Sequence, residues 1–364
     1  MNLSSFKYYM PTKIVFGENS LKQIDEFTMG RRTLLVTSAG FVKRGVVKQI
    51  QSYTSNIVAV VSEVQSHPDI SDIKELYAEA YKHDFDIVVA LGGGSVLDVS
   101  KFLAVAHSTD KTGVMVEKLM HKKENIENFN IKPIISIPTT AGTSSEVTPW
   151  ATIWDNQDKR KYSLHLPELF SEVALYDPIL TLSLPREITV QTTLDALSHS
   201  LESIWNKNAS EITIAYAVKA AQKIVKNLPL LLNDLNNVQY RTEILKACMY
   251  AGMAFSNTQT AVAHAMSYSI TLNHGIPHGI ACSFTLPMLL KAVMGVDKRV
   301  DKALKSIFGE QAEVESVNFF KKVDVSIDFK DYNMQKADFD VVLGNLSREQ
   351  RLQNSIVPLE NIKY

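Results

Sequence analysis

The sequence predicts an α/β domain in the N-terminal half of the chain and a helical domain in the C-terminal half. Short apolar runs rich in β-branched residues alternate with helical patterns in the first half, as in α/β folds with a parallel sheet. From about residue 189 the pattern changes to one helix after another. The chain has 364 residues, and a single hydrophobic core rarely extends beyond about 250–300 residues.

Each predicted strand is an almost continuous apolar run, and the four runs lie at residues 33–37, 57–61, 86–91 and 133–138. Such runs indicate strands that are buried on both faces, as in parallel sheets. The segments between and after them have helical periodicity, which predicts helices at residues 42–52, 70–83 and 95–106. Strand and helix therefore alternate as in a doubly wound α/β domain.

The C-terminal helices are predicted at residues 193–205, 211–227, 241–256 and 258–273. Before the first of them, Asp177-Pro178 and Leu184-Pro185 interrupt the pattern, and such dipeptides mark turns. We therefore place the domain boundary there, between residues 1–183 and 184–364. The tail from about Asp324 is more polar, and we predict no elements in it.

The composition is that of an ordinary globular protein, with 45% hydrophobic and 21% charged residues. A formal net charge of −1 argues against a nucleic-acid partner, because such proteins carry basic patches. No apolar stretch approaches the roughly 20 residues that span a bilayer, and the first residues do not resemble a signal peptide. Cys248 and Cys282 lie in apolar surroundings and fit no metal or redox spacing. We therefore expect a cytoplasmic protein that does not bind membranes.

A glycine-rich turn, Gly92-Gly93-Gly94-Ser95, follows a predicted strand and opens a predicted helix. Glycine allows the backbone to approach a phosphate closely and to adopt positive φ. The free N–H groups at the following helix start favour an anion. This turn is not the G-x-G-x-x-G fingerprint, so a tight strand–helix turn without a ligand stays open as an alternative.

A second polar segment, residues 138–146, follows the last predicted strand and contains five hydroxyl side chains. In open α/β sheets, ligands bind at the carboxyl ends of the strands. A solvated loop would explain this segment alone, but two such loops together favour a nucleotide site.

One carboxylate and three imidazoles form a candidate metal site. Asp195 and His199 are four residues apart on a predicted helix and so share a face. His264 lies on another predicted helix, and His278 lies in a turn fourteen residues later. Such a set can hold Fe(II) or Zn(II) with a position left open. Because the chain contains nine histidines, coincidental spacing remains an alternative.

At this point the sequence resembles the iron-containing (group III) alcohol dehydrogenases. Residues 195–202 resemble the family's ligand helix, and His264 and His278 match its other two ligand positions. The glycine-rich turn and residues 138–148 match its two nucleotide segments. Lys161, Asp177-Pro178 and residues 11–17 also align, so the resemblance covers nearly the whole chain.

The resemblance implies a Rossmann-type, dehydroquinate-synthase-like nucleotide domain and an all-α metal domain, with the active site in the cleft between them. It implies that Asp195, His199, His264 and His278 bind the metal. The cofactor contacts that it implies are Gly92, Gly93, Gly94, Ser95, Asp98, Thr139, Thr140, Thr143 and Lys161.

The sequence departs from the family pattern at two places. Some members carry a histidine four residues after the third ligand, where this chain has Tyr268. Tyr268 and His274 are therefore candidates for a proton relay, and both are also explained as side chains that line the cleft. Members that prefer NAD often have an acidic residue where this chain has Ser38. With Lys43 and Arg44 nearby to pair a phosphate, we expect NADP(H) or dual use with NAD(H).

The expected substrate is a small aldehyde or primary alcohol. Residues 146–155 also resemble a branch that reduces phosphonoacetaldehyde to 2-hydroxyethylphosphonate. An anionic substrate needs basic residues at the site, and the sequence does not place any. We expect Trp150, Phe255 and Tyr268 to line the substrate pocket.

Three other functions remain open. Dehydroquinate-synthase-like and glycerol-dehydrogenase-like enzymes share the fold but differ in their metal ligands. A non-catalytic nucleotide-binding module is the third, although all four expected ligands are present. By analogy with the family we expect a homodimer, with residues 8–13 adding an edge strand.

Overall fold

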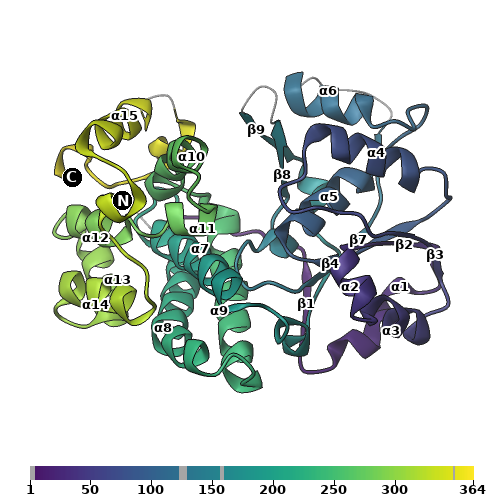
Figure 1. Ribbon diagram of the computed structural model, residues 1–364, viewed down its shortest axis with the longest axis horizontal. Helices are drawn as coiled ribbons and strands as arrows, with labels where there is room; N and C mark the ends of the chain where they lie inside the picture. Colours follow the sequence, from purple (N-terminus) through teal and green to yellow (C-terminus); the bar gives the residue numbers. More distant parts are fainter. Residues whose placement is uncertain (1–4, 123–128, 156–159, 347–348) are drawn as a thin grey trace. The chain divides into compact units, whose positions relative to one another are not determined.

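The computed structural model describes residues 5–122, 129–155, 160–346 and 349–364. Contacts divide the chain into two compact units, which Figure 1 colours along the sequence. We call them the sheet unit, residues 10–140 and 144–181, and the helical unit, residues 1–9, 141–143 and 182–364.

The sheet unit is built on a six-stranded sheet in the order β1-β10-β7-β4-β2-β3, and every neighbouring pair is parallel. Its strands are β1 (Lys13–Phe16), β2 (Thr33–Val36), β3 (Ile57–Val61), β4 (Ile87–Gly92), β7 (Ile134–Pro138) and β10 (Val173–Tyr176). The predicted fold class is confirmed, and all four predicted strands are present. Sequence analysis missed β1 and β10, which have only four residues each.

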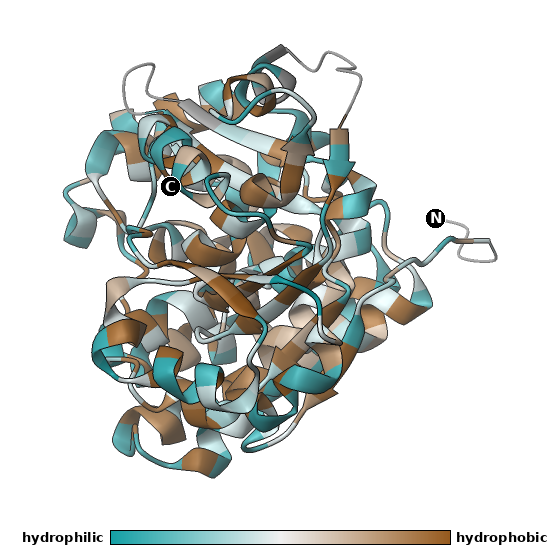
Figure 2. Ribbon diagram, turned by 90° about the vertical axis from the view of Figure 1, so that its right-hand side faces the viewer, coloured by the Kyte–Doolittle hydropathy of each residue, from teal (hydrophilic) through white to brown (hydrophobic). Residues whose placement is uncertain are grey.

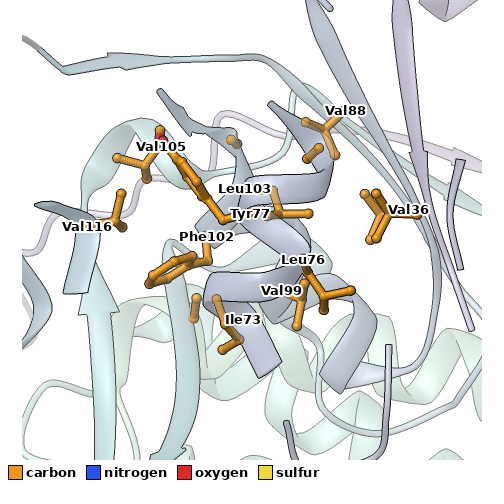
Figure 3. Packing of buried hydrophobic residues seen from close by; sticks show 14 of the residues in the cluster. Val36, Ile73, Leu76, Tyr77, Val88, Val99, Phe102, Leu103, Val105 and Val116 are labelled. Carbon is orange, nitrogen blue, oxygen red and sulfur yellow. The ribbon is translucent and has the colours of Figure 1, made fainter. Parts of the chain in front are cut away.

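The strands contribute to two hydrophobic cores because successive side chains point to opposite faces of a sheet. Leu34 and Val88 belong to one core, whereas Leu35 and Val89 belong to the other. Figure 3 shows the first core, in which Tyr77 lies among aliphatic side chains and Phe102. Figure 2 shows the strands largely in hydrophobic brown, and helices that carry teal hydrophilic residues. Burial on both faces explains why these strands have no polar alternation.

The helices of the sheet unit are α1 (Ile24–Thr28), α2 (Ala39–Lys43), α3 (Val46–Tyr53), α4 (Ile70–Ala80), α5 (Gly94–Ala104) and α6 (Val114–Lys122). The predicted helix at 42–52 is in fact two helices, because Gly45 adopts a positive φ of 76° between them, which glycine tolerates without strain. Two hairpins pair β5 (Val105–His107) with β6 (Phe129–Ile131) and β8 (Trp150–Asp155) with β9 (Arg160–His165).

The helical unit contains α7 (Arg186–Ile204), α8 (Glu211–Asn233), α9 (Val238–Thr258), α10 (Val262–His274), α11 (His278–Ala281), α12 (Leu286–Val293), α13 (Lys298–Phe308), α14 (Ala312–Lys322) and α15 (Lys336–Leu346). The four helices predicted from periodicity correspond to α7 to α10. The polar tail, for which we predicted no elements, contains α15 and short 3-10 helices, including η6 (Gln350–Asn354).

The N-terminal segment packs on the helical unit before the sheet begins. The Tyr8 hydroxyl donates to the Met253 carbonyl at 3.2 Å, and the Tyr9 amide donates to Asn257 Oδ1 at 2.8 Å. The edge strand therefore starts only at Lys13, where β1 pairs with β10. None of the helices in the described ranges has the length and apolar character needed to cross a membrane.

Candidate active site

Helix α7 carries two of the predicted metal ligands on one buried face. Asp195 and His199 are each 5% exposed, and one turn of helix brings His199 Nε2 to 3.8 Å from Asp195 Oδ1. The helix starts directly after Pro185, whose fixed φ suits a helix start. The i,i+4 spacing seen in the sequence is therefore realised as a shared face.

Helices α10 and α11 bring the other two predicted ligands to the same place. His264 Nε2 lies 3.3 Å from Asp195 Oδ1, and His278 is the first residue of α11. The chain reverses between these helices at Gly275, which has a φ of 67°. A Cβ added at Gly279 would lie 2.0 Å from the Gln191 carbonyl oxygen of α7. Glycine at 279 therefore lets α11 pack directly on the ligand helix.

These side chains have the spacing of ligands around one small cation. Donor atoms of Asp195, His264, His278 and Cys282 all lie within 4.8 Å of one another. The His199 ring stacks on the His264 ring, with centroids 4.6 Å apart. Donor atoms that bind one tetrahedral ion at about 2.1 Å are roughly 3.4 Å apart, close to the 3.3 and 3.8 Å distances of the two Asp195–histidine pairs. The residues present thus fit a divalent metal ion.

Cys282 is a member of this cluster that the sequence analysis assigned only to apolar surroundings. Its Sγ lies 3.4 Å from Asp195 Oδ1, because Cys282 is four residues after His278. Burial and the Asp195 carboxylate both raise the pKa of this thiol. A protonated thiol donates a hydrogen bond and is a poor metal ligand, so the imidazoles are the stronger candidates. The H-x-x-x-C spacing was the signal available in the sequence.

Glu202 was also missed, although it holds one of the ligands in place. Its side chain is fully buried, and its Oε2 lies 2.6 Å from His264 Nδ1. The backbone amides of Ala261, Ala263 and His264 also donate to its two oxygens. An ionised carboxylate can only accept, so His264 donates from Nδ1 and keeps Nε2 available for a cation. The sequence signal was a charged residue seven positions after Asp195, on the same helical face.

The electrostatics of the cluster favour a bound cation. Burial alone would raise the pKa of the Asp195 carboxyl, but His199, His264 and His278 lower it overall. Burial likewise raises the pKa of Glu202, and His264 and backbone amides lower it overall. Two buried carboxylates therefore stay ionised and need positive charge nearby. Burial lowers the pKa of His264, but Glu202 and Asp195 raise it overall, and a metal ion would take the place of a proton on this imidazole.

The residues predicted for the proton relay and for the substrate pocket lie in several parts of the structure. The Tyr268 ring is nearly parallel to the His278 ring, with centroids 6.1 Å apart. The Phe255 ring stacks on His199 at 4.0 Å. His274 is the last residue of α10, and no hydrogen bond or ring contact links it to the cluster within the described residues. Trp150 stacks on His165 inside the sheet unit.

The glycine-rich turn is formed as predicted. Its glycines are needed for close packing of the backbone and not for positive φ. Strand β4 ends at Gly92, and Gly93 caps the start of α5. None of its three glycines has a positive φ, so a left-handed backbone is not the reason for glycine here. Instead, a Cβ at Gly92 would lie 2.5 Å from Val96, and one at Gly93 would lie 2.9 Å from Thr140. Close packing excludes side chains at Gly92 and Gly93, and the first N–H groups of α5 have no acceptor within the helix.

The second polar segment, residues 138–146, is hydrogen-bonded to this turn. The Thr139 amide donates to the Gly92 carbonyl at 3.0 Å. Asp98 accepts from the Ser145 hydroxyl at 2.7 Å and from the Thr152 amide at 3.1 Å. Asp98 therefore holds the segment in place. Lys101, which was not singled out in the sequence, is fully buried, and its Nζ lies 2.6–2.9 Å from oxygens of Ser145, Thr148 and Trp150.

The remaining predicted cofactor residues are dispersed over several elements. Ser95 Oγ accepts from the His67 amide at 3.2 Å. Thr143 follows Gly142, where a Cβ would lie 2.4 Å from the Thr192 carbonyl oxygen of α7. Ser38 precedes α2 and forms a backbone bridge with Glu63. Lys161 lies in β9 opposite Trp154, and its side chain is outside what the structure describes.

Comparison with known proteins agrees with this geometry. Residues 11–178 match the family model described as iron-containing alcohol dehydrogenase. Residues 189–358 match the model for the C-terminal part of the Fe-containing alcohol dehydrogenase family. Together the two matches span most of the chain.

Similar proteins include enzymes of more than one name. A 1,3-propanediol dehydrogenase from Klebsiella pneumoniae is 30% identical over 299 residues, covering 79% of this chain and 75% of that protein. A sulfoacetaldehyde reductase from Bilophila wadsworthia is 26% identical over 373 residues, covering 96% and 95%. The solved structure of a sulfoacetaldehyde reductase from Bifidobacterium kashiwanohense in complex with NAD+ has a TM-score of 0.91 at 28% identity, covering 98% and 96%.

Glu202→Gln should weaken metal binding about 10- to 100-fold, because the outer partner of a ligating imidazole fixes its orientation. Competition titration with a chelator measures this affinity. Glu187→Gln, at an exposed position of the same helix, is the matched control and should bind metal like the wild type. Equal affinity of both variants would contradict the role given to Glu202.

Gly279→Ala should lower the free energy of unfolding by about 1–3 kcal/mol or more, because the new methyl collides with the Gln191 carbonyl. It should also lower metal content, since His278 is the neighbouring residue. Chemical denaturation and metal analysis measure these effects. Gly344→Ala in α15, where an added Cβ meets nothing within 4 Å, should be neutral or stabilising. Wild-type stability and metal content in Gly279→Ala would refute the packing argument.

Proposed function

Because this chain belongs to the iron-containing alcohol dehydrogenase family, we propose that the buried cluster of one carboxylate and three imidazoles holds the catalytic metal of a nicotinamide-dependent oxidoreductase. The reaction interconverts a small aldehyde and its primary alcohol. In the reducing direction the aldehyde takes up a hydride and a proton, and NAD(P)H becomes NAD(P)+. The observation that carries the proposal is the convergence of Asp195, His199, His264 and His278.

The chain's own residues prepare the site for this reaction. A divalent ion held by the cluster supplies a Lewis acid for the substrate oxygen. Glu202 orients His264, and Gly279 allows His278 to reach the cluster. The first N–H groups of α5, which have no acceptor within the helix, bind the pyrophosphate of the dinucleotide. The Tyr268 hydroxyl, which lies beside His278, holds the proton that passes to or from the substrate oxygen, and His274 stays a second candidate for this proton transfer.

For the metal we propose Fe(II) or Zn(II), since a nitrogen- and oxygen-rich set of this size suits both ions. The thiol of Cys282 adds no anionic sulfur ligand while it stays protonated. The substrate that we propose is a short aldehyde. Relatives are named for a three-carbon diol and for sulfoacetaldehyde, and phosphonoacetaldehyde, indicated by residues 146–155, has the same carbon chain as the latter.

For the dinucleotide we propose that NADPH is accepted alongside NADH. Ser38 at the end of β2 offers no carboxylate to repel a 2′-phosphate. The Arg44 guanidinium folds back over the start of α2, where its Nη1 would lie 3.3 Å from a Cβ on Gly40. Its Cζ lies 4.2 Å from the centroid of the Phe41 ring. A planar guanidinium held over Gly40 and Phe41, shortly after Ser38 in the chain, can pair a phosphate with two hydrogen bonds.

Asp195→Ala and His278→Ala should each lose bound metal and lower turnover by more than about 100-fold, because the electrostatic stabilisation of the developing oxyanion contributes several kcal/mol. Elemental analysis and nicotinamide absorbance measure the two effects. His83→Ala, an exposed histidine of the sheet unit, is the control and should keep both. Full turnover by metal-free His278→Ala would refute the proposed role of the metal.

Arg44→Ala should lower kcat/KM for NADPH about 10-fold while changing that for NADH much less, because a charged hydrogen bond contributes about 1.5–3 kcal/mol. Steady-state kinetics with both dinucleotides give the ratio. Lys48→Ala removes an exposed charge from the neighbouring helix α3 and serves as the control. An NADPH-to-NADH ratio that does not change in Arg44→Ala would exclude this residue as the phosphate contact.

A further inference from the structure

The C-terminal segment around η6 is attached to the two helices that contribute most of the cluster. The Asn354 side-chain amide donates to the Thr260 carbonyl, just before α10, at 2.9 Å. The Asn354 carbonyl accepts from the Lys207 amide at 2.7 Å, and the Ile356 amide donates to the Trp205 carbonyl at the end of α7. Although η6 is more than 70 residues from His278 in sequence, these bonds fix it against the end of α7 and the start of α10.

This attachment places Arg351 against a residue that contacts the cluster directly. The Arg351 Cζ lies 5.0 Å from the centroid of the Tyr268 ring, and that ring is stacked parallel to His278. Burial lowers the pKa of Arg351, and the negative charge of Glu202 opposes that shift. An arginine remains protonated under such conditions, so a poorly solvated positive charge contacts the ring that stacks on His278.

No acceptor in the described part of the chain uses the N–H groups of this guanidinium. The cation–π contact with Tyr268 engages the face of the ring and leaves the five N–H donors unused. Glu202 is the carboxylate whose charge reaches Arg351, but its oxygens already accept from His264 and from backbone amides. The arrangement is therefore suited to an anion brought by a ligand.

We propose that Arg351 binds the anionic head group of the substrate, which is a short aldehyde that carries a sulfonate, phosphonate or carboxylate group. This inference rests on the proposed function, because it assumes that the aldehyde carbon lies at the metal centre. A guanidinium pairs with each of these oxyanions through two parallel hydrogen bonds. Tyr268 then has two contacts, holding the guanidinium on its ring and lying beside His278. Arg351 thereby supplies the basic residue that an anionic substrate requires. The sequence patterns did not locate this residue.

The test compares aldehydes that differ in charge but little in size. Steady-state kcat/KM is measured for sulfoacetaldehyde, phosphonoacetaldehyde, 3-oxopropanoate and neutral propanal, with the metal-loaded wild type, Arg351→Met, Arg351→Lys and the control Lys302→Met. Lys302 is exposed on α13, so the control loses the same charge from a remote surface. The three anionic aldehydes distinguish which head group is preferred.

The wild type should prefer at least one anionic aldehyde over propanal. Arg351→Met should lower kcat/KM for that aldehyde about 10- to 100-fold, mainly through KM. The loss for propanal should be much smaller, Arg351→Lys should restore part of the difference, and Lys302→Met should behave as the wild type. Equal losses for charged and neutral aldehydes, or no loss, would overturn the proposal.

A binding measurement separates this inference from the proposed function. Isothermal titration of the metal-loaded protein with NAD+ uses 2-hydroxyethanesulfonate, 2-hydroxyethylphosphonate and 3-hydroxypropanoate, with 1-propanol as the neutral control. Tighter binding of one of these anions by the wild type than by Arg351→Met supports the anion site even if no aldehyde is turned over, in which case only the proposed function fails. If the enzyme reduces propanal but neither prefers nor binds any of these anions, the proposed anion site is wrong. The proposed dehydrogenase function is then retained.

Discussion

The structure depends on one buried carboxylate. Asp195 is almost completely excluded from solvent, and it is approached by the imidazole of His199 on its own helix and by those of His264 and His278 from α10 and α11. An ionised carboxylate is stable in such a place only when positive charge is close. A cation held by the three histidines would provide that charge, and Glu202 fixes the orientation of His264. The chemistry that we propose follows from this requirement for charge balance.

Helix α7 positions the groups that take part in this charge balance. Gln191 and Thr192 are consecutive residues one turn before Asp195, and glycines approach both of their carbonyls closely. Gly279 brings in α11 with His278, and Gly142 brings in the loop that carries Thr143. A side chain at either glycine would push a functional segment away from the carboxylate. The backbone of α7 therefore positions both a proposed metal ligand, His278, and the loop of the proposed cofactor contact Thr143.

Patterns that depend on short sequence distances could be read without a structure. The spacing of Asp195 and His199 predicted a shared helical face, and the apolar runs predicted buried strands. Residues defined by tertiary contacts could not be found in this way. Arg351 is polar and distant in sequence, so only the attachment of η6 places it beside Tyr268. Strands β1 and β10 were too short to stand out, and the lack of room for a side chain at Gly93 comes from its tertiary contact with Thr140.

Anomalous diffraction from crystals of the metal-loaded protein, recorded at the iron or zinc edge, tests the central claim most directly. The account predicts one strong peak about 2.0–2.2 Å from a carboxylate oxygen of Asp195 and from a nitrogen of His199, His264 and His278. The Cys282 sulfur should lie beyond the bonding distance of about 2.3 Å. A peak at another site, or a stoichiometrically loaded protein without a peak among these four side chains, would contradict it.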